Sequence, residues 1–287
     1  MTSPTTQQRT QGLLEPAILL YLAVKSFVLT LIDALVWRKR HLSDVRDDAF
    51  AQFWDWITPP RDPNQPLEGS AAIISQLLPS AEGIVLELGP GSGDQIQNLK
   101  PARKQITKVY GAEPCIPLHI PLRANARLSG FGEDKYEIVS ASAEKHSLLA
   151  GLDQAGLLPP KAKASHGQGG VFDTIICVRV LCSVDNLEET CDTLYRLLKP
   201  GGKLLFCEHV VNPWRTAKGS GLARALQIVY SLLGWTFFVG NCHLTRNTGQ
   251  VLINAPKGCT AGSWAEVQLD THFGWSCLPY ASGTLVK

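Results

Sequence analysis

The feature that most constrains the fold is a glycine-rich run behind a short apolar strand. Residues 86–93 read Leu-Glu-Leu-Gly-Pro-Gly-Ser-Gly and follow the apolar pair Ile84 and Val85. This order predicts a buried strand that ends in a glycine turn. Because glycine has no Cβ, the backbone of such a turn can lie close to a bound nucleoside. We therefore expect a cofactor-binding site at the backbone of Gly89, Gly91 and Gly93.

Acidic residues near the predicted strand ends narrow the choice of cofactor. Glu87 stands just before the turn, where it suits an ammonium group better than a pyrophosphate. A second short strand ends at Glu113, which has the spacing to hold a ribose diol. An ammonium, a ribose and an adenine without phosphate describe S-adenosylmethionine. The adenine side and the methyl side of this site are predicted at Pro114, Ser142, Ala143, Glu144 and Val178. Dinucleotide sites use similar glycines, and each acidic residue taken singly is also typical of a solvated strand end.

Composition sets the size and class of the protein. The 287 residues, 45% of them hydrophobic, suffice for one large α/β domain with an extension. The net charge of +2 comes from scattered residues, which excludes a nucleic-acid footprint. The eight cysteines show no metal-ligand spacing, so we expect reduced thiols, no metal and a cytosol-facing protein.

The N-terminal part predicts a long apolar helix. Residues 17–36 are mostly apolar, but Lys25 and Asp33 interrupt them, and a basic cluster follows at 38–40. At helical spacing the polar residues form one narrow stripe, which favours a helix lying in a membrane interface. A helix docked on the protein's own core and a true membrane span are the alternatives. The predicted stripe consists of Ser26, Thr30, Asp33, Trp37 and Arg40.

The remaining pattern alternates strands with helices and predicts a mostly parallel sheet covered on both faces. The helix expected at 47–56 packs over the catalytic domain or, alternatively, forms a substrate lid. Prolines indicate a linker at 59–66, and glycine, lysine and proline indicate an exposed insertion at 151–170. Strands are expected near 83–88, 107–112, 136–140, 172–177 and 203–208, a helix at 187–198, and a final hairpin at 264–269 and 283–286.

Several motifs resemble one family more closely than the glycine turn alone does. The motifs ELGPGSG, FDTIICVRVLCSV, LLKPGG, FCEHV and GNCHLTRNT and the closing LPYASGTLVK are similar to the methyltransferase-like protein 7 family. This resemblance implies an α/β fold, a seven-stranded Rossmann-like class I methyltransferase sheet with an N-terminal helical extension. It also implies S-adenosylmethionine as cofactor, thiol S-methylation and membrane association. The chain departs from the family at Pro90, at Glu113 and in the insertion at 151–170.

Candidates for the acceptor side follow the predicted fourth and fifth strands. His209 is expected to act as a base or an orienting group, or else as a rim histidine bonded to a backbone carbonyl. Cys182 lies in a loop expected to face the methyl group, where a buried inert thiol is the alternative to a nucleophile. The apolar segment at 222–239 predicts a lid over a small lipophilic substrate, with ordinary core packing as the alternative. Its candidate contacts are Trp235, Phe238 and His243.

These expectations combine into one working hypothesis. An N-terminal extension at 1–66 precedes a methyltransferase domain at 67–287, whose acceptor lid covers about 212–246. The enzyme is expected to methylate a small lipophilic thiol. We expect it at the cytosol-facing surface of a membrane, either the endoplasmic reticulum or a lipid droplet, and a cytoplasmic location is the alternative. Two further alternatives are an O- or N-methyltransferase of secondary metabolism and a cofactor-binding scaffold without turnover.

Overall fold

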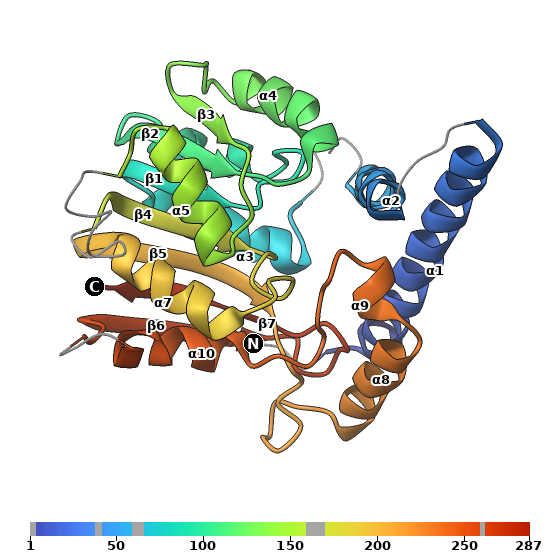
Figure 1. Ribbon diagram of the computed structural model, residues 1–287. Coiled ribbons are helices and arrows are strands. Elements are labelled where there is room, and N and C mark those ends of the chain that lie inside the picture. The colour runs from blue at the N-terminus through green and yellow to red at the C-terminus, as the bar shows by residue number, and fades with distance from the viewer. Residues whose placement is uncertain (1–3, 38–41, 59–65, 159–169, 259–261) are drawn as a thin grey trace. The chain divides into compact units, whose positions relative to one another are not determined.

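The chain forms two compact units. The computed structural model describes residues 4–37, 42–58, 66–158, 170–258 and 262–287 (Figure 1). Unit 1 comprises Met1–Gln65, His209–Asn247 and Thr271–Tyr280, and unit 2 comprises Pro66–Glu208, Thr248–Asp270 and Ala281–Lys287. Unit 1 therefore joins the N-terminal helices with the segment expected to be a lid, which the sequence assigned to the methyltransferase domain.

Unit 2 is built on a seven-stranded sheet with the order β3-β2-β1-β4-β5-β7-β6. The four pairings among β1 to β5 are parallel, because helical crossovers connect these strands. The expected class I sheet and its closing strand pair are confirmed. The strands are β1 (Gly83–Leu88), β2 (Ile106–Ala112), β3 (Tyr136–Val139), β4 (Phe172–Val178), β5 (Leu198–His209), β6 (Glu266–His272) and β7 (Tyr280–Val286).

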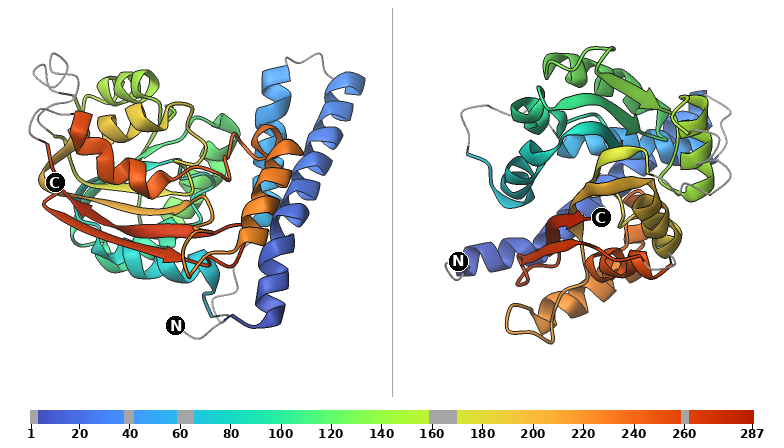
Figure 2. Two further views of the ribbon diagram at one scale, coloured as in Figure 1. Left: turned by 90° about the horizontal axis from the view of Figure 1, so that it is seen from below. Right: turned by 90° about the vertical axis from the view of Figure 1, so that its left-hand side faces the viewer.

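Helices cover both faces of this sheet. Helices α5 (Lys145–Gln154), α7 (Leu187–Leu197) and α10 (Thr248–Asn254) lie on one face (Figure 1), and α3 (Gly69–Leu77) lies on the other (Figure 2). α4 (His119–Leu128) packs near β3. Asn186 caps α7 by accepting a hydrogen bond from the Glu189 amide. Short 3-10 turns complete the unit at η1 (Leu78–Ser80), η2 (Ile96–Ala102), η3 (Ile116–Leu118) and η4 (Ala255–Gly258).

Some boundaries differ from those predicted. β5 begins at Leu198 rather than 203, because a register shift between Phe172 and Thr174 of β4 lets pairing continue through the Pro-Gly-Gly turn. Residues 151–154, expected to open the insertion, complete α5 instead, and Gly151 and Leu152 are buried there. The rest of the insertion at 159–169 and the linker at 59–65 lie outside the described residues.

Unit 1 is helical. Helices α1 (Thr6–Trp37) and α2 (Leu42–Ile57) pack against each other, and α8 (Gly221–Leu232) and α9 (Trp235–Phe238) pack on α1 (Figure 2). The ring of Phe27 lies edge-on to two aromatic rings of α9, with centroids 5.3 and 5.5 Å away. Tyr230 of α8 donates a hydrogen bond to the carbonyl of Leu13 at 3.0 Å. The predicted apolar helix at 17–36 is thus the central part of a longer one.

Two buried amides fix the segment after β5 within unit 1. The Asn212 side chain donates to the carbonyls of Gly274 and Ser276 at 2.7 and 2.9 Å. The side-chain oxygen of Gln227 accepts a hydrogen bond from the backbone N–H of Asn212 at 2.9 Å. The side-chain nitrogen of Gln227 donates to the backbone carbonyls of Val210 and Cys277. Because these amides are buried and satisfied, they determine how α8 is attached.

The polar stripe predicted on α1 does not lie wholly on the exposed side of the helix. Ser26 is fully buried, and its hydroxyl lies 2.8 Å from the Ala49 carbonyl and 2.9 Å from Gln52 Oε1 of α2. A serine hydroxyl buried beside apolar residues needs such partners. Part of the stripe therefore faces α2 rather than solvent, and the side of α1 left exposed is mainly apolar.

Candidate active site

The glycine turn after β1 has the backbone that only glycine adopts readily. Its three glycines have φ angles of 54°, 60° and 87°. A Cβ on Gly93 would lie 2.9 Å from Leu122 Cδ1 of α4. The Asn125 side chain donates to the Ser92 carbonyl at 2.8 Å, which ties α4 to the turn. The loop is therefore preorganised by neighbours that the sequence pattern did not indicate.

Glu113 organises this turn from the end of β2. One carboxylate oxygen accepts the amide of Gly91 at 2.8 Å, and the other accepts the amide of Cys115 at 2.8 Å. Burial raises the pKa of Glu113, while these amide donors and nearby His119 oppose the rise. A carboxylate oxygen accepts more than one hydrogen bond, so Glu113 retains capacity for a ribose hydroxyl.

Glu87 is held on the same sheet by a tyrosine. The Tyr136 hydroxyl donates to Glu87 Oε2 at 2.7 Å, and Glu87 is 3% exposed. Burial raises the pKa of Glu87 to about 7, the hydrogen bond from Tyr136 lowers it, and the charge of Glu113 raises it. A Cβ at Gly111 would collide with the Tyr136 hydroxyl, which explains the glycine in β2. Glu87 is thus a buried carboxyl group that Tyr136 holds close to the turn.

The adenine and methyl sides follow the ends of β3 and β4. Ser142 donates its amide to the Ser147 hydroxyl at 2.9 Å, and Glu144 accepts the Asp185 amide at 3.3 Å. Glu144 therefore links the loops after β3 and β4. Ala143 is buried, Val178 is half-buried at the tip of β4, and Pro114 is exposed.

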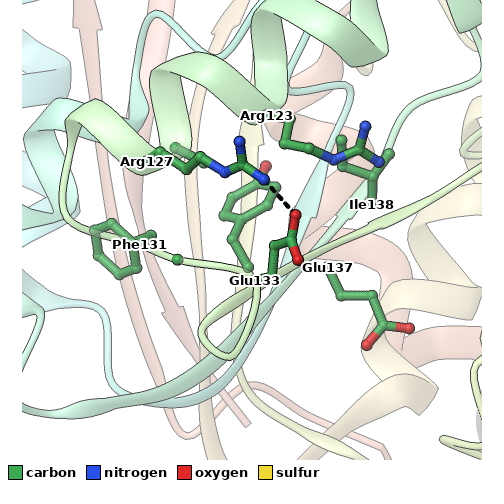
Figure 3. Close-up of a pocket in the computed structure, with 9 residues that line it drawn as sticks. Arg123, Arg127, Phe131, Glu133, Glu137 and Ile138 are labelled. Atoms are coloured by element: carbon green, nitrogen blue, oxygen red, sulfur yellow. Dashed lines mark hydrogen bonds and ion pairs between the residues drawn. The ribbon is translucent and has the colours of Figure 1, made fainter.

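A cavity of about 600 Å³ lies at the edge strand β3 (Figure 3). It is lined by Tyr136 and by charged residues of α4 and the following loop, among them the ion pair of Arg127 and Glu133. Tyr136 thus lines this cavity while its hydroxyl binds Glu87. None of the predicted site residues lines this cavity.

In unit 1, His209 belongs to a cluster of three side chains. Its Nε2 lies 2.6 Å from the Tyr280 hydroxyl, and its Nδ1 lies 3.6 Å from the Cys242 thiol. The rings of His209 and Tyr280 meet edge-on with centroids 4.6 Å apart. The sequence predicted His209 but neither partner. A hydroxyl partner replaces the backbone carbonyl considered from the sequence.

The other acceptor candidates are placed differently. Trp235 is 1% exposed, and its indole N–H has no hydrogen-bond partner among the described residues. Phe238 packs against Phe27, and His243 is half-buried next to Cys242. Cys182, in unit 2, is 2% exposed, as expected for an inert thiol. These roles in acceptor binding stay predictions.

Comparison with known proteins identifies the family. Residues 66–241 match a family model described as methyltransferase domain. The chain belongs to this methyltransferase family. S-adenosylmethionine is its methyl donor, as predicted. The expectation of an enzyme is confirmed, and the scaffold alternative is set aside.

Curated relatives match only part of the chain. A rat protein named thiol S-methyltransferase TMT1B is 33% identical over 120 residues, which are 40% of this chain and 44% of the relative. The human protein of the same name is 33% identical over 101 residues, 35% of this chain and 36% of the relative. A hybrid PKS-NRPS synthetase of Emericella nidulans is 27% identical over 197 residues, 68% of this chain and 4% of its own length.

Solved structures show the same fold. A putative O-methyltransferase from Nostoc punctiforme has a TM-score of 0.53 at 13% identity and covers 96% of this chain and 71% of its own. PigF, solved with SAH, has a TM-score of 0.50 at 14% identity, with 93% of this chain and 70% of its own covered.

The residues of unit 2 fit this cofactor. The glycine turn, with its positive φ angles, admits a close ligand, and two buried carboxylates suit an ammonium and a ribose diol. We assign these roles to Glu87 and Glu113 as predictions. Sequence reasoning missed the contacts of Tyr136, Asn125 and Glu208, since each side chain contacts residues far away in the sequence.

Proposed function

We propose that this methyltransferase transfers a methyl group to the sulfur of a small lipophilic thiol. The observation that carries the proposal is the match to relatives named thiol S-methyltransferase, at 33% identity. That match covers less than half of either chain, so the substrate class is an inference.

Chemistry supports the choice of a thiol. The cofactor supplies an activated methyl group on a sulfonium, so the protein needs only to align the acceptor, exclude water and accept a proton. A thiol with a pKa near 8.5 is partly ionised at neutral pH and needs little help from a base. His209, hydrogen-bonded to Tyr280, is able to take that proton.

The same pair favours a second candidate, an O- or N-methyltransferase of secondary metabolism. A phenol has a pKa near 10 and depends more strongly on a base. The similarity to part of a hybrid PKS-NRPS synthetase over 68% of the chain also supports this candidate.

Matched acceptors distinguish the two candidates. Purified protein is incubated with methyl-labelled S-adenosylmethionine and three lipophilic compounds that differ only in a thiol, a phenol or an amine. We expect label mainly on the thiol, and His209→Gln to lower that rate by less than about tenfold. Label mainly on the phenol or amine, together with a loss of about 100-fold or more in His209→Gln, would establish the second candidate instead.

We further propose that unit 1 rests on a lipid bilayer. α1 is long and apolar enough to cross a membrane by length and composition, although a soluble core helix or a signal sequence also meets that test. Only 22% of its most apolar window is buried. α8 adds a second exposed apolar face that the sequence analysis had assigned to a lid. The exposed large apolar residues of these helices are Leu14, Ile18, Tyr21, Val28, Leu29, Ile32, Leu35, Val36, Leu222, Ile228, Val229 and Leu232.

Charge and shape support lipid as the occupant of this face. At about 1.5 Å per residue, the 32 residues of α1 extend about 48 Å, which exceeds the roughly 30 Å thickness of a bilayer's hydrocarbon core. The sequence Arg38-Lys39-Arg40 follows α1, and such a cluster favours anionic head groups. Lys25, the basic residue within the apolar stretch, lies 5.3 Å from the ring of Trp56 in α2.

Vesicle flotation tests the bilayer proposal with matched variants. Leu35→Asp on α1 and Leu232→Asp on α8 place a charge at positions 77% and 82% exposed, and Leu128→Asp on α4 does the same at 79%. With vesicles containing phosphatidylserine, we expect the first two variants to bind at least severalfold more weakly and the third to bind as the wild type does. Equal binding by all three would refute the bilayer contact, and loss by Leu35→Asp alone would limit it to α1.

A further inference from the structure

A buried carboxylate lies near the end of β5 in unit 2. Glu208 is fully buried, and its Oε1 accepts the amides of Val180 and Leu181, each at 3.0 Å. Its Oε2 accepts the amide of Cys182 at 3.4 Å. Three successive backbone N–H groups converge on one carboxylate, and such donors stabilise its ionised form.

The loop that Glu208 holds begins in an unusual conformation. Arg179 has a φ of 57°, a region that residues with a side chain rarely adopt. Its amide donates to the Cys207 carbonyl at 3.0 Å, so β5 fixes the first step of the loop as well. The Arg179 backbone therefore turns sharply after β4 and directs the next three amides to Glu208.

The same loop packs on the glycine turn. A Cβ built on Gly89 would lie 2.8 Å from Val180 Cγ2. Glu208 thus acts on the turn through a short series of contacts, from its carboxylate to the Val180 amide and from the Val180 side chain to Gly89. Removing the carboxylate would leave three buried amides without this acceptor, which is costly.

The charge of Glu208 also affects its surroundings. Burial and then this charge raise the pKa of the Cys177 and Cys191 thiols. Burial raises the pKa of Cys207 most, nearby Arg179 lowers it, and Glu208 raises it. A negative charge inside the protein is screened much less by salt than one at the surface.

We propose that Glu208 is a positioning residue that also selects the charged form of the cofactor. Its carboxylate holds residues 180–182 on the glycine turn, and its negative charge favours a sulfonium over a neutral thioether. Methyl transfer breaks the S–CH3 bond and leaves its electron pair on sulfur, so the product S-adenosylhomocysteine lacks the positive charge. Glu208 therefore strengthens the binding of the substrate form relative to the product.

The inference rests on the proposed placement of the cofactor at the glycine turn, and the test separates the two. Calorimetry measures the affinities of S-adenosylmethionine and S-adenosylhomocysteine for the full chain, for Glu208→Gln and for Glu189→Gln. Glu189 is a matched control because it is a partly exposed carboxylate of α7, paired with Lys145. A buried charge acting at an effective dielectric constant near 20 is expected to change affinity on the order of tenfold.

We expect Glu208→Gln to lower the preference for S-adenosylmethionine over S-adenosylhomocysteine roughly tenfold and Glu189→Gln to leave it unchanged. An equal loss for both ligands, or an unchanged ratio, would overturn the selective role. If Glu208→Gln does not fold, Glu208→Asp keeps the charge on a shorter side chain. Glu208→Asp must keep the wild-type ratio of S-adenosylmethionine affinity to S-adenosylhomocysteine affinity, even where both affinities fall. A reduced ratio in this variant would overturn the proposal.

Gly91→Val tests the placement separately. Its φ of 60° disfavours valine, so we expect both ligands to lose binding. Undiminished binding would refute the cofactor placement, whatever the ratio measured for Glu208→Gln.

Discussion

Replacing Glu87 by glutamine should change how the stability of the protein depends on pH. Glu87 is 3% exposed, and its pKa is raised from an ordinary 4.5 to about 7. An acid with a raised pKa in the folded state stabilises the fold below its unfolded pKa, and that contribution is lost as pH rises through the folded pKa. Glutamine resembles the protonated side chain at every pH. The stability of the wild type relative to Glu87→Gln should therefore fall between about pH 4.5 and pH 7.

The size of the change follows from the two pKa values. Each pH unit between them corresponds to about 1.4 kcal/mol, so the full difference is about 3 kcal/mol. This pH-dependent loss of stability should be absent below pH 4.5 and should reach a constant value above about pH 7.5. Urea unfolding of both proteins at pH 4.5, 5.5, 6.5 and 7.5 measures it, because titrating groups that do not interact with Glu87 cancel in the comparison.

Tyr136→Phe provides the second arm of this experiment. The Tyr136 hydroxyl donates to the Glu87 carboxylate and lowers its pKa. Without that donor, the pH range over which stability is lost should extend to higher pH. A stability difference between wild type and Glu87→Gln that does not vary with pH would refute the reasoning. A wild type that gains relative stability as pH rises would show that the folded pKa is depressed.

Three further predictions concern the cofactor-binding site and unit 1. Gly93→Ala should lower cofactor affinity by at least about tenfold, since the new Cβ would lie 2.9 Å from Leu122 Cδ1. The control Gly156→Ala, at a position with φ of 72° and open space around it, should cost about 1 kcal/mol of stability and leave affinity unchanged. Calorimetry measures the affinities and urea unfolding measures the stabilities. Trp235→Ala should lower the free energy of unfolding by about 3–5 kcal/mol, because a fully buried indole leaves a cavity, and a loss below about 1 kcal/mol would contradict that packing. Gln227→Ala should cost about 2–3 kcal/mol by leaving buried backbone groups unpaired, and an unchanged urea midpoint would speak against the hydrogen bonds at Asn212, Val210 and Cys277.

The sequence predicted those parts of the fold that depend on local pattern. The apolar run before the glycine turn, the helix expected at 187–198 and the alternation of strands and helices each fix an element within a few residues. The fold was therefore predictable, although the register shift in β4 that extends β5 was not. A bulge depends on how two strands pair, and the sequence of one strand does not show it.

The side-chain contacts of the site were mostly beyond such reasoning. Glu87 and Glu113 were found because they flank a recognisable turn. The Tyr136 contact was missed because Tyr136 lies 49 residues from Glu87. The contacts of Glu208 were missed because its amide partners lie 26 to 28 residues away. Ser26 was placed on a solvated stripe because helical spacing shows which residues share a face but not what covers it.

The contact between Leu13 and Tyr230 has a consequence for synthesis of the chain. These residues are 217 positions apart, so α1 leaves the ribosome long before α8 exists to cover its inner face. At about 5–20 residues per second, this interval lasts roughly 10–40 s. During that time an apolar helix of 32 residues is available to a chaperone or a membrane-targeting factor. The order of translation thus gives the N-terminal helix time to make the proposed membrane contact before unit 1 is complete.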